Sequence, residues 1–192
     1  MRIVELILDD DKGTGVEAIS IVENPAIEEN FVALNKEIEI KLAEVDSDKR
    51  ILMGAALIPN KNIYRRSGDE EYYIFFSKDT VKKASELYLM NGFQNNATLE
   101  HSTKLKDLSV VESWIVESEV DKSRNYGLEM PIGTWMVSMK VNNEDVWQEF
   151  VKTKKVKGFS IEGYFSDKVE MNLQKAKEDE LIEKIKQLLK DE

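Results

Sequence analysis

The chain has 192 residues, 42% of them hydrophobic and 33% charged, which is enough for one domain with a hydrophobic core. Its formal net charge of −10 argues against nucleic acid as a main partner, because phosphate binding requires clustered lysine and arginine. The absence of cysteine excludes disulfides, thiolate metal sites and a cysteine nucleophile. No apolar run approaches the roughly 20 residues of a membrane span, so we expect a soluble protein without a membrane partner.

The first half of the chain alternates β-prone segments with turns. The pattern predicts a strand at 2–8, an extended or irregular segment at 18–34, a half-buried strand at 37–42 and a central strand at 51–58. A polar turn at 65–71 and a strand at 72–76 follow. The next segment predicts a helix, with Ser77 as its N-cap and Gly92 just past its end.

The second half continues this pattern. It predicts strands at 97–102, 108–117, 133–141 and 159–165, a turn at 121–127, and a second helix capped by Asn143. From 174 the chain is charged and helix-forming, with an apolar stripe. We therefore predict an α+β, mostly β fold with about two packing helices. Residues 1–167 form its domain, and residues 168–192 form an amphipathic C-terminal helix or tail.

The segment KGFSIEG (157–163) presents a serine from a strand. Phe159 and Ile161 alternate with Ser160 and Glu162, which places Ser160 on the polar face. The motif is not the GxSxG elbow of α/β-hydrolases. Taken alone, the segment favours a solvent-facing serine with no chemical role over a nucleophile.

His101 is the only histidine in the chain. On a strand it would share a face with Ala97 and Leu99 and point into the fold or a cleft. A catalytic zinc site normally takes two or more histidines, so no metal is expected. One histidine suffices as the general base for a hydroxyl nucleophile. The alternative is a core histidine with satisfied hydrogen bonds.

A carboxylate is then needed to orient the imidazole and to stabilise its charged form. Glu112 lies in the middle of the strand predicted at 108–117, on the face of Val110 and Trp114. The alternative interpretation of Glu112 is a solvated residue on an edge strand with no catalytic role. Glu162 is the rival candidate, because it shares the face of Ser160, whereas Glu100 should point away from His101.

Five motifs in order resemble a known family. They are AISIVENPAIEENFVAL, LEHS, VVESWIVE, PIGTW and KGFSIEGYF, between about Val16 and Phe165. This set is similar to the prohead (procapsid maturation) serine proteases of tailed bacteriophages, and most of all to the XkdF-like phage serine proteases. The family is related to the herpesvirus assemblin proteases.

The resemblance implies a barrel-like, mixed or antiparallel β core in which a histidine and a serine on separate strands form the catalytic pair. On this chain the pair is His101 and Ser160. The assemblin relatives use a second histidine, which is absent here, so Glu112 or a bare dyad would replace it. No cofactor is implied. The implied location is the host cytoplasm, inside the assembling procapsid, with homo-oligomers as one expected state.

The prediction is a serine endopeptidase acting by acyl transfer, whose substrates are the scaffold, the major capsid protein and itself. The loop around Pro131 to Gly133 is the expected source of oxyanion donors. Two alternatives stay open at this point. One is a non-catalytic procapsid or scaffold-associated protein of the same fold, and the other is a generic serine esterase.

Overall fold

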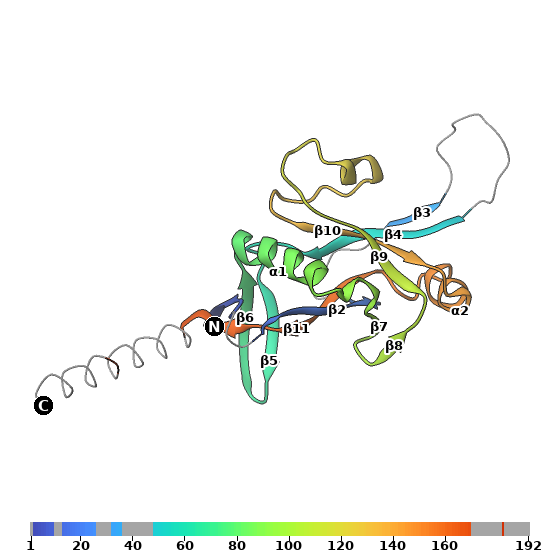
Figure 1. Ribbon diagram of the computed structural model, residues 1–192. Coiled ribbons are helices and arrows are strands. Elements are labelled where there is room, and N and C mark those ends of the chain that lie inside the picture. Colours follow the sequence, from blue (N-terminus) through green and yellow to red (C-terminus); the bar gives the residue numbers. More distant parts are fainter. Residues whose placement is uncertain (1, 10–12, 26–31, 36–47, 170–181, 183–192) are drawn as a thin grey trace, which may run out of the picture.

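The computed structural model describes residues 2–9, 13–25, 32–35, 48–169 and 182 (Figure 1). Strands dominate this part of the chain and two short α-helices accompany them, so the predicted α+β, mostly β class is confirmed. The strand predicted at 37–42 lies outside the described residues. So does the C-terminal stripe predicted from 174, except for Ile182.

The strands form three four-stranded sheets. The first sheet, in the order β12-β1-β6-β5, contains β1 (Arg2–Ile7), β5 (Ile63–Ser67), β6 (Glu70–Phe76) and β12 (Ser166–Asp167). The second, in the order β3-β4-β10-β9, contains β3 (Val32–Asn35), β4 (Asp48–Leu57), β9 (Leu108–Ile115) and β10 (Trp135–Val141). The third, in the order β11-β2-β7-β8, contains β2 (Gly15–Val22), β7 (Ala97–Leu99), β8 (Thr103–Leu105) and β11 (Gly158–Tyr164).

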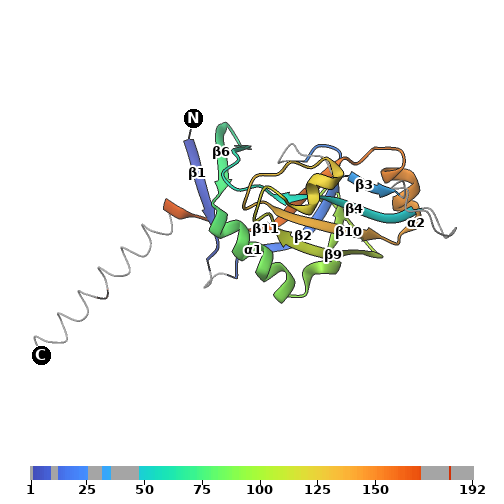
Figure 2. The same ribbon diagram turned by 90° about the horizontal axis from the view of Figure 1, so that it is seen from above.

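The three sheets do not join into a closed barrel within the described residues. β11 lies beside β4, but no hydrogen-bonded ladder connects the two strands. In Figures 1 and 2 the strands of the first sheet stand at one end of the molecule and run crosswise to those of the other two sheets. The barrel-like core implied by the resemblance is therefore not closed, because β11 and β4 lie side by side without pairing.

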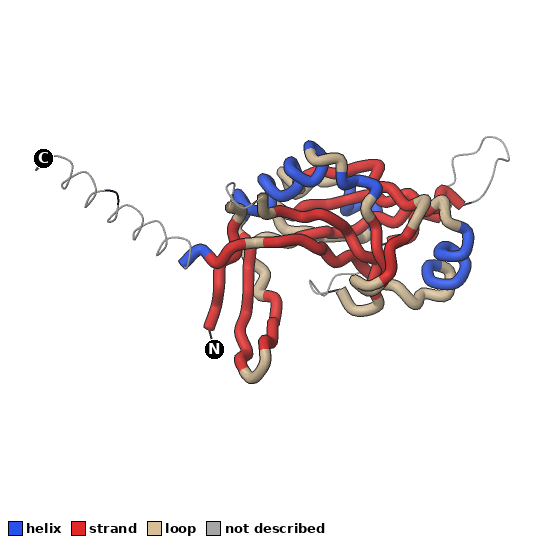
Figure 3. Tube along the Cα trace, turned by 60° about the horizontal axis from the view of Figure 1, so that its bottom comes forward, coloured by secondary structure: helices blue, strands red, loops and turns tan. Residues whose placement is uncertain are grey.

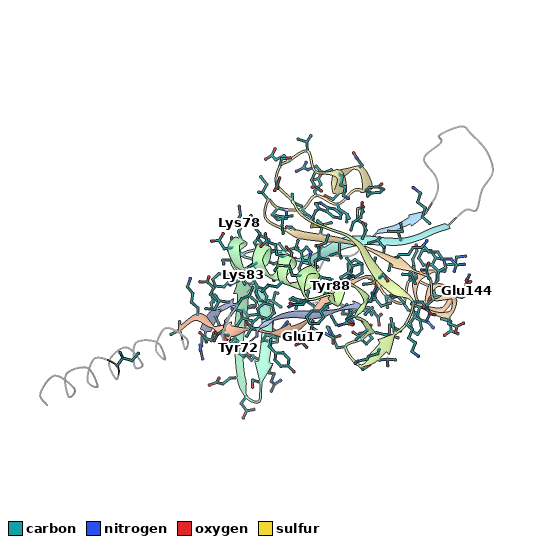
Figure 4. All side chains as sticks on the ribbon, viewed as in Figure 1. Glu17, Tyr72, Lys78, Lys83, Tyr88 and Glu144 are labelled. Carbon is teal, nitrogen blue, oxygen red and sulfur yellow. The ribbon has the colours of Figure 1, made fainter. Side chains whose placement is uncertain are left out.

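Helix α1 (Lys78–Met90) begins and ends where the sequence predicts. The Ser77 side chain accepts a hydrogen bond from the Thr80 N–H (3.4 Å), and Gly92 follows the end in a left-handed conformation, before the short 3-10 helix η2 (Phe93–Asn95). Tyr88 is fully buried and packs edge-on against Trp135, with 5.4 Å between ring centroids. Figure 4 labels Lys78 and Tyr88 near the two ends of this helix.

The remaining helices are short. Asn143 caps α2 (Glu144–Val146), as predicted, and the chain continues into a π-helical turn, η4 (Trp147–Val151). A 3-10 helix, η3 (Lys122–Tyr126), forms inside the turn predicted at 121–127. Figure 3 shows α1 along one side of the strands and α2 at one end. The helices therefore cover the strands without separating the second sheet from the third.

Two segments differ from the prediction. Part of the turn predicted at 65–71 belongs to β5, which pairs with β6 through a two-residue loop, so a hairpin projects from the body (Figure 1). Its polar side chains obscured the strand, but Tyr64 and Tyr73 pack against each other across the ladder (6.0 Å between ring centroids). The segment predicted as extended or irregular at 18–34 contains the regular, mostly buried strand β2, which ends before Pro25.

Candidate active site

The strand that carries KGFSIEG forms an edge of the third sheet. β11 pairs antiparallel with β2, and β2 pairs parallel with β7. The register places Ser160 opposite Ser20, and Ser20 opposite Thr98. Direct cross-strand partners project from the same face of a sheet. Three hydroxyl side chains therefore form a row across three strands.

Ser160 is buried, with 6% of its surface exposed, and is not a solvent-facing strand residue. The predicted alternation is present beside it, since Phe159 is fully buried and projects from the other face. No side-chain hydrogen bond of Ser160 is found among the described residues. The residue also borders a cavity of about 300 Å³. Its hydroxyl is therefore not committed to a structural bond within the described part of the chain.

Ser20 is the competing hydroxyl, and no sequence motif pointed to it. It is fully buried, its Oγ donates to the Thr98 carbonyl (3.3 Å), and the same Oγ accepts from the His101 N–H (3.0 Å). The Ser20 hydroxyl thus acts both as a donor and as an acceptor, and both hydrogen bonds hold the backbone of β7 and of the turn that follows it. Of the two cross-strand partners, Ser160 is the one suited to act as a nucleophile.

His101 lies in a turn and not on a strand as predicted, because β7 ends at Leu99. Glu100 and His101 both have positive φ (+49° and +56°), and the Ser102 N–H donates to the Leu99 carbonyl (3.1 Å). These are the features of a type I′ turn, which links β7 to β8. The Glu100 carboxylate accepts a hydrogen bond from the Glu23 N–H (2.7 Å). The Glu100 N–H also donates to the Ile21 carbonyl (3.2 Å), so the turn is fastened to β2 and to Glu23 just after it.

Glu162 is the carboxylate beside the imidazole. Its Oε1 lies 3.2 Å from His101 Nδ1, and the same oxygen accepts a hydrogen bond from the Thr98 hydroxyl. Glu162 shares a face with Ser160 because it follows two residues later on β11. The Glu162 and His101 side chains are 29% and 44% exposed, so solvent reaches both. The pair bridges β11 and the β7–β8 turn across β2.

His101 and Ser160 are brought near each other through Ser20. Ser160 is the direct cross-strand partner of Ser20, whose hydroxyl holds the His101 N–H. No hydrogen bond between the His101 and Ser160 side chains is found among the described residues. The serine, the histidine and Glu162 therefore gather on one face of one sheet, with the imidazole bonded to the acid.

Glu112, the acid favoured by the sequence pattern, lies elsewhere. It is on β9, the edge strand of the second sheet. Its two oxygens bind the Lys122 ammonium (2.8 Å) and the Ser138 hydroxyl (2.5 Å). The hydrogen bonds from Lys122 and Ser138 hold the pKa of this carboxyl below its usual value. The prediction of Glu112 as partner of His101 is corrected to Glu162, because periodicity gives the face of a strand and not the sheet to which it belongs.

Two of the N–H groups at the loop around Pro131 to Gly133 are already hydrogen-bonded. The Gly133 N–H donates to the Val116 carbonyl (2.8 Å), and the Thr134 N–H donates to the Pro131 carbonyl (3.1 Å). The Lys78 side chain approaches Gly133, which places this loop beside the start of α1. These N–H groups hold the loop together and are not available to an oxyanion.

A second cavity, of about 230 Å³, is bordered by Glu162. Thr98, Lys104 and Glu17 line it, and Figure 4 labels Glu17 on β2. Among the described residues, no group of three or more His, Asp or Glu side chains could hold a metal ion. The helices in the same part of the chain are also too short or too polar to cross a membrane.

The comparisons with known proteins give one result. A family model described as "Putative phage serine protease XkdF" matches residues 37–170, which is more than half of the chain. The matched segment contains His101, Ser160 and Glu162. Neither the curated proteins nor the solved structures gave a significant match. The chain therefore belongs to the XkdF family of phage serine proteases.

Proposed function

We propose that this chain is a serine endopeptidase in which Ser160 is the nucleophile, His101 the general base and Glu162 the acid that orients the base. The observation that carries the proposal is the contact between the Glu162 carboxylate and His101 Nδ1. Glu162 lies two residues after Ser160 on the same strand, β11. A nucleophile, a base and a third group that orients the base are the elements of a catalytic triad.

In this mechanism, the neutral imidazole keeps its proton on Nδ1, where Glu162 accepts the hydrogen bond. The other nitrogen, Nε2, then takes the proton from the Ser160 hydroxyl as its oxygen attacks the scissile carbonyl. The imidazolium later returns that proton to the leaving amine, and water hydrolyses the acyl-enzyme in a second round. Glu162 stays ionised throughout and stabilises the imidazolium. Catalytic hydrogen bonds are often long without substrate, so the proposal needs no Ser160–His101 bond in the free protein.

Backbone strain at the base supports the same proposal. Glu100 and His101 occupy the left-handed region, which costs a non-glycine residue roughly 1–2 kcal/mol. Three hydrogen bonds hold this turn in place. The His101 N–H donates to the Ser20 hydroxyl, the Glu100 N–H donates to the Ile21 carbonyl (3.2 Å), and the Glu23 N–H donates to the Glu100 carboxylate. Strain of this kind persists where the surrounding structure fixes it, and it is common at active sites.

As substrates we propose the scaffold protein, the N-terminal arm of the major capsid protein and the chain itself, cleaved inside the procapsid in the host cytoplasm. Membership of a phage serine protease family supports this setting. The likeness to the assemblin proteases and assembly into homo-oligomers belong to the same proposal. Its support is that Ser160 on β11 and the turn that carries His101 after β7 belong to the same β-sheet.

Replacing Ser160 with alanine tests the proposal. We expect Ser160→Ala to lower cleavage of co-expressed capsid or scaffold protein at least a thousandfold, because the acyl-enzyme can no longer form. A fluorophosphonate probe should label the wild-type protein on the peptide that contains Ser160. Processing is measured by electrophoresis, and the labelled residue is identified by mass spectrometry.

Ser20→Ala is the matched control, because it removes the neighbouring hydroxyl of the same row. It should retain labelling at Ser160, with a lower rate because the His101 turn loses one anchor. Processing that persists in Ser160→Ala, or a probe attached to Ser20, would contradict the assignment. A wild-type protein that neither cleaves nor takes the probe would favour the non-catalytic, scaffold-associated alternative. Labelling combined with cleavage of small esters only would favour the esterase.

A further inference from the structure

The cavity beside Ser160 lies where the three sheets meet. It opens along the free edge of β11, between that strand, the end of β4 and the first sheet. Most of its wall is apolar, formed by Leu57, Ile63, Ile74, Phe76, Ile161 and Phe165. Its volume of about 300 Å³ is at the lower end of the range for ligand pockets. The cavity is thus large enough for a side chain of a polypeptide bound at Ser160.

Arg65 is the one charged residue among the described residues that line this cavity. It faces the cavity from β5, opposite Tyr72 on β6, which Figure 4 labels. Its guanidinium donates to the Tyr64 carbonyl (3.0 Å), and no carboxylate within the described part of the chain forms an ion pair with it. Burial lowers the pKa of Arg65, although arginine remains protonated at neutral pH. A half-buried cation with four further N–H donors and no counter-charge is suited to binding an anion.

We propose that this cavity is a substrate subsite that takes an acidic side chain, glutamate or aspartate, from a residue close to the scissile bond. The inference rests on the proposed role of Ser160 as nucleophile, which borders the same cavity. The carboxylate binds the Arg65 guanidinium, whose planar fork matches it with two parallel hydrogen bonds. The apolar wall covers the methylene groups of the same side chain.

The first experiment measures cleavage preference. The full-length protein digests denatured casein, the products are sequenced by mass spectrometry, and Ser160→Ala defines the background. We expect Glu and Asp to be enriched at one position within three residues of the cleaved bond. Arg65→Gln should lose this enrichment by about ten- to a hundredfold, because a hydrogen bond to a charged partner is removed.

Arg66→Gln is the matched control, since it removes the same charge from the adjacent position. Arg66 is exposed, lies on the opposite face of β5, and donates to the Gly68 carbonyl. It should leave the preference unchanged. Casein cleavage without acidic enrichment, or an equal effect of both variants, overturns the subsite while leaving the protease assignment intact.

The second experiment does not depend on catalysis. In the Ser160→Ala background, N-acetyl-glutamate N-methylamide is titrated by NMR against its glutamine counterpart. The acidic compound should shift signals of residues in the cavity wall at millimolar concentration, and Arg65→Gln should abolish those shifts, whereas the glutamine compound should shift none. Equal shifts with the two compounds, or shifts that persist in Arg65→Gln, overturn the proposal.

A folding control keeps both experiments decisive. Arg65→Gln and Arg66→Gln should show the same dispersed amide spectrum as the parent protein. If Arg65→Gln unfolds, Arg65→Lys replaces it: this variant keeps the charge but lacks the planar fork. It should bind the acidic compound several-fold more weakly than the parent. Unchanged binding by Arg65→Lys would show that the fork has no role and would overturn the proposed contact.

Discussion

Glu162 and Glu112 each place a carboxylate next to a hydroxyl donor, yet only one of them touches the imidazole. Glu162 accepts from Thr98 and lies against His101, whereas Glu112 accepts from Ser138 and Lys122. Besides the hydroxyl, Glu112 contacts a lysine and Glu162 contacts a histidine. Glu112 is paired with a lysine ammonium, whereas Glu162 lies beside an imidazole, a group that can take up and release a proton near neutral pH. At the residue scale, this difference separates a structural ion pair from a candidate catalytic pair.

Exchanging each glutamate for glutamine tests this distinction. Glu162→Gln keeps the size of the side chain but removes the charge that stabilises the imidazolium, so we expect kcat to fall by roughly a thousandfold with little change in KM. Steady-state kinetics on a peptide substrate between pH 5 and pH 9 measures both kcat and KM.

Glu112→Gln is the control for this experiment. It removes the same charge from the second sheet, and it should change kcat by less than twofold because no contact joins it to His101 within the described residues. The assignment is wrong if Glu112→Gln slows catalysis as much as Glu162→Gln does. It is equally wrong if Glu162→Gln leaves kcat unchanged.

At the scale of the elements, the close approach of β11 and β2 explains the second glycine of GFSIEG. The ladder between these strands shifts register between Glu162 and Gly163, as a β-bulge does. A Cβ placed on Gly163 would collide with the Gly15 carbonyl oxygen and lie 2.8 Å from Val16 Cα. The contact is with backbone atoms, which cannot move aside as a side chain does. Gly163 therefore lets Glu162 turn toward His101 while β11 stays paired with β2.

Gly163→Ala should destabilise the protein by about 3 kcal/mol, because the added methyl group forces the two strands apart. Gly68→Ala is the comparison, since Gly68 has open space around its Cβ position and a φ of +60°. That change carries only the left-handed penalty of roughly 1 kcal/mol. Urea unfolding followed by circular dichroism measures both. Equal costs for the two variants would contradict the close approach of the strands.

At the scale of the whole molecule, stability should fall in acid through the carboxylates that the fold holds ionised. Hydrogen bonds from Lys122 and Ser138 lower the pKa of Glu112 from 4.5. Burial raises the pKa of Asp121, but bonds from Ser123 and Trp114 and the charge of Lys122 outweigh it, so this pKa lies below 3.8. Groups with a lowered pKa stabilise the fold above their unfolded pKa values, and that contribution disappears as the pH falls through the folded values.

The expected result is a free energy of unfolding that decreases as the pH falls below about 4.5, over the range set by these two groups. Glu112→Gln should lose part of this pH dependence, by roughly 0.5 kcal/mol, the size of a partly exposed ion pair. Urea unfolding at pH 7, 4 and 3 measures the change. A mutant whose stability falls as steeply as that of the wild type would show that Glu112 does not contribute.

Local signals in the sequence were sufficient for several elements. Ser77 and Asn143 cap the helices that they were predicted to cap, because a short polar side chain before an apolar stripe is a local signal. The central strand at 51–58 was recognisable from its continuous apolar run, and β4 occupies it. β5 was missed because Arg65 and Arg66 resemble a polar turn. Only the pairing with β6 and the packing of Arg65 beside the cavity make this segment a strand.

The sequence by itself determined the family, the mostly β class, and Ser160 and His101 as the candidate pair, because composition, periodicity and short motifs are properties of the chain. The tertiary structure decided which groups meet. It placed His101 in a strained turn, brought Glu162 to its Nδ1 instead of Glu112, and set Arg65 in the wall of the cavity that Ser160 borders. These contacts depend on the register of β11, β2 and β7 and on how the sheets pack. Register and packing join residues more than sixty positions apart, which no local pattern specifies.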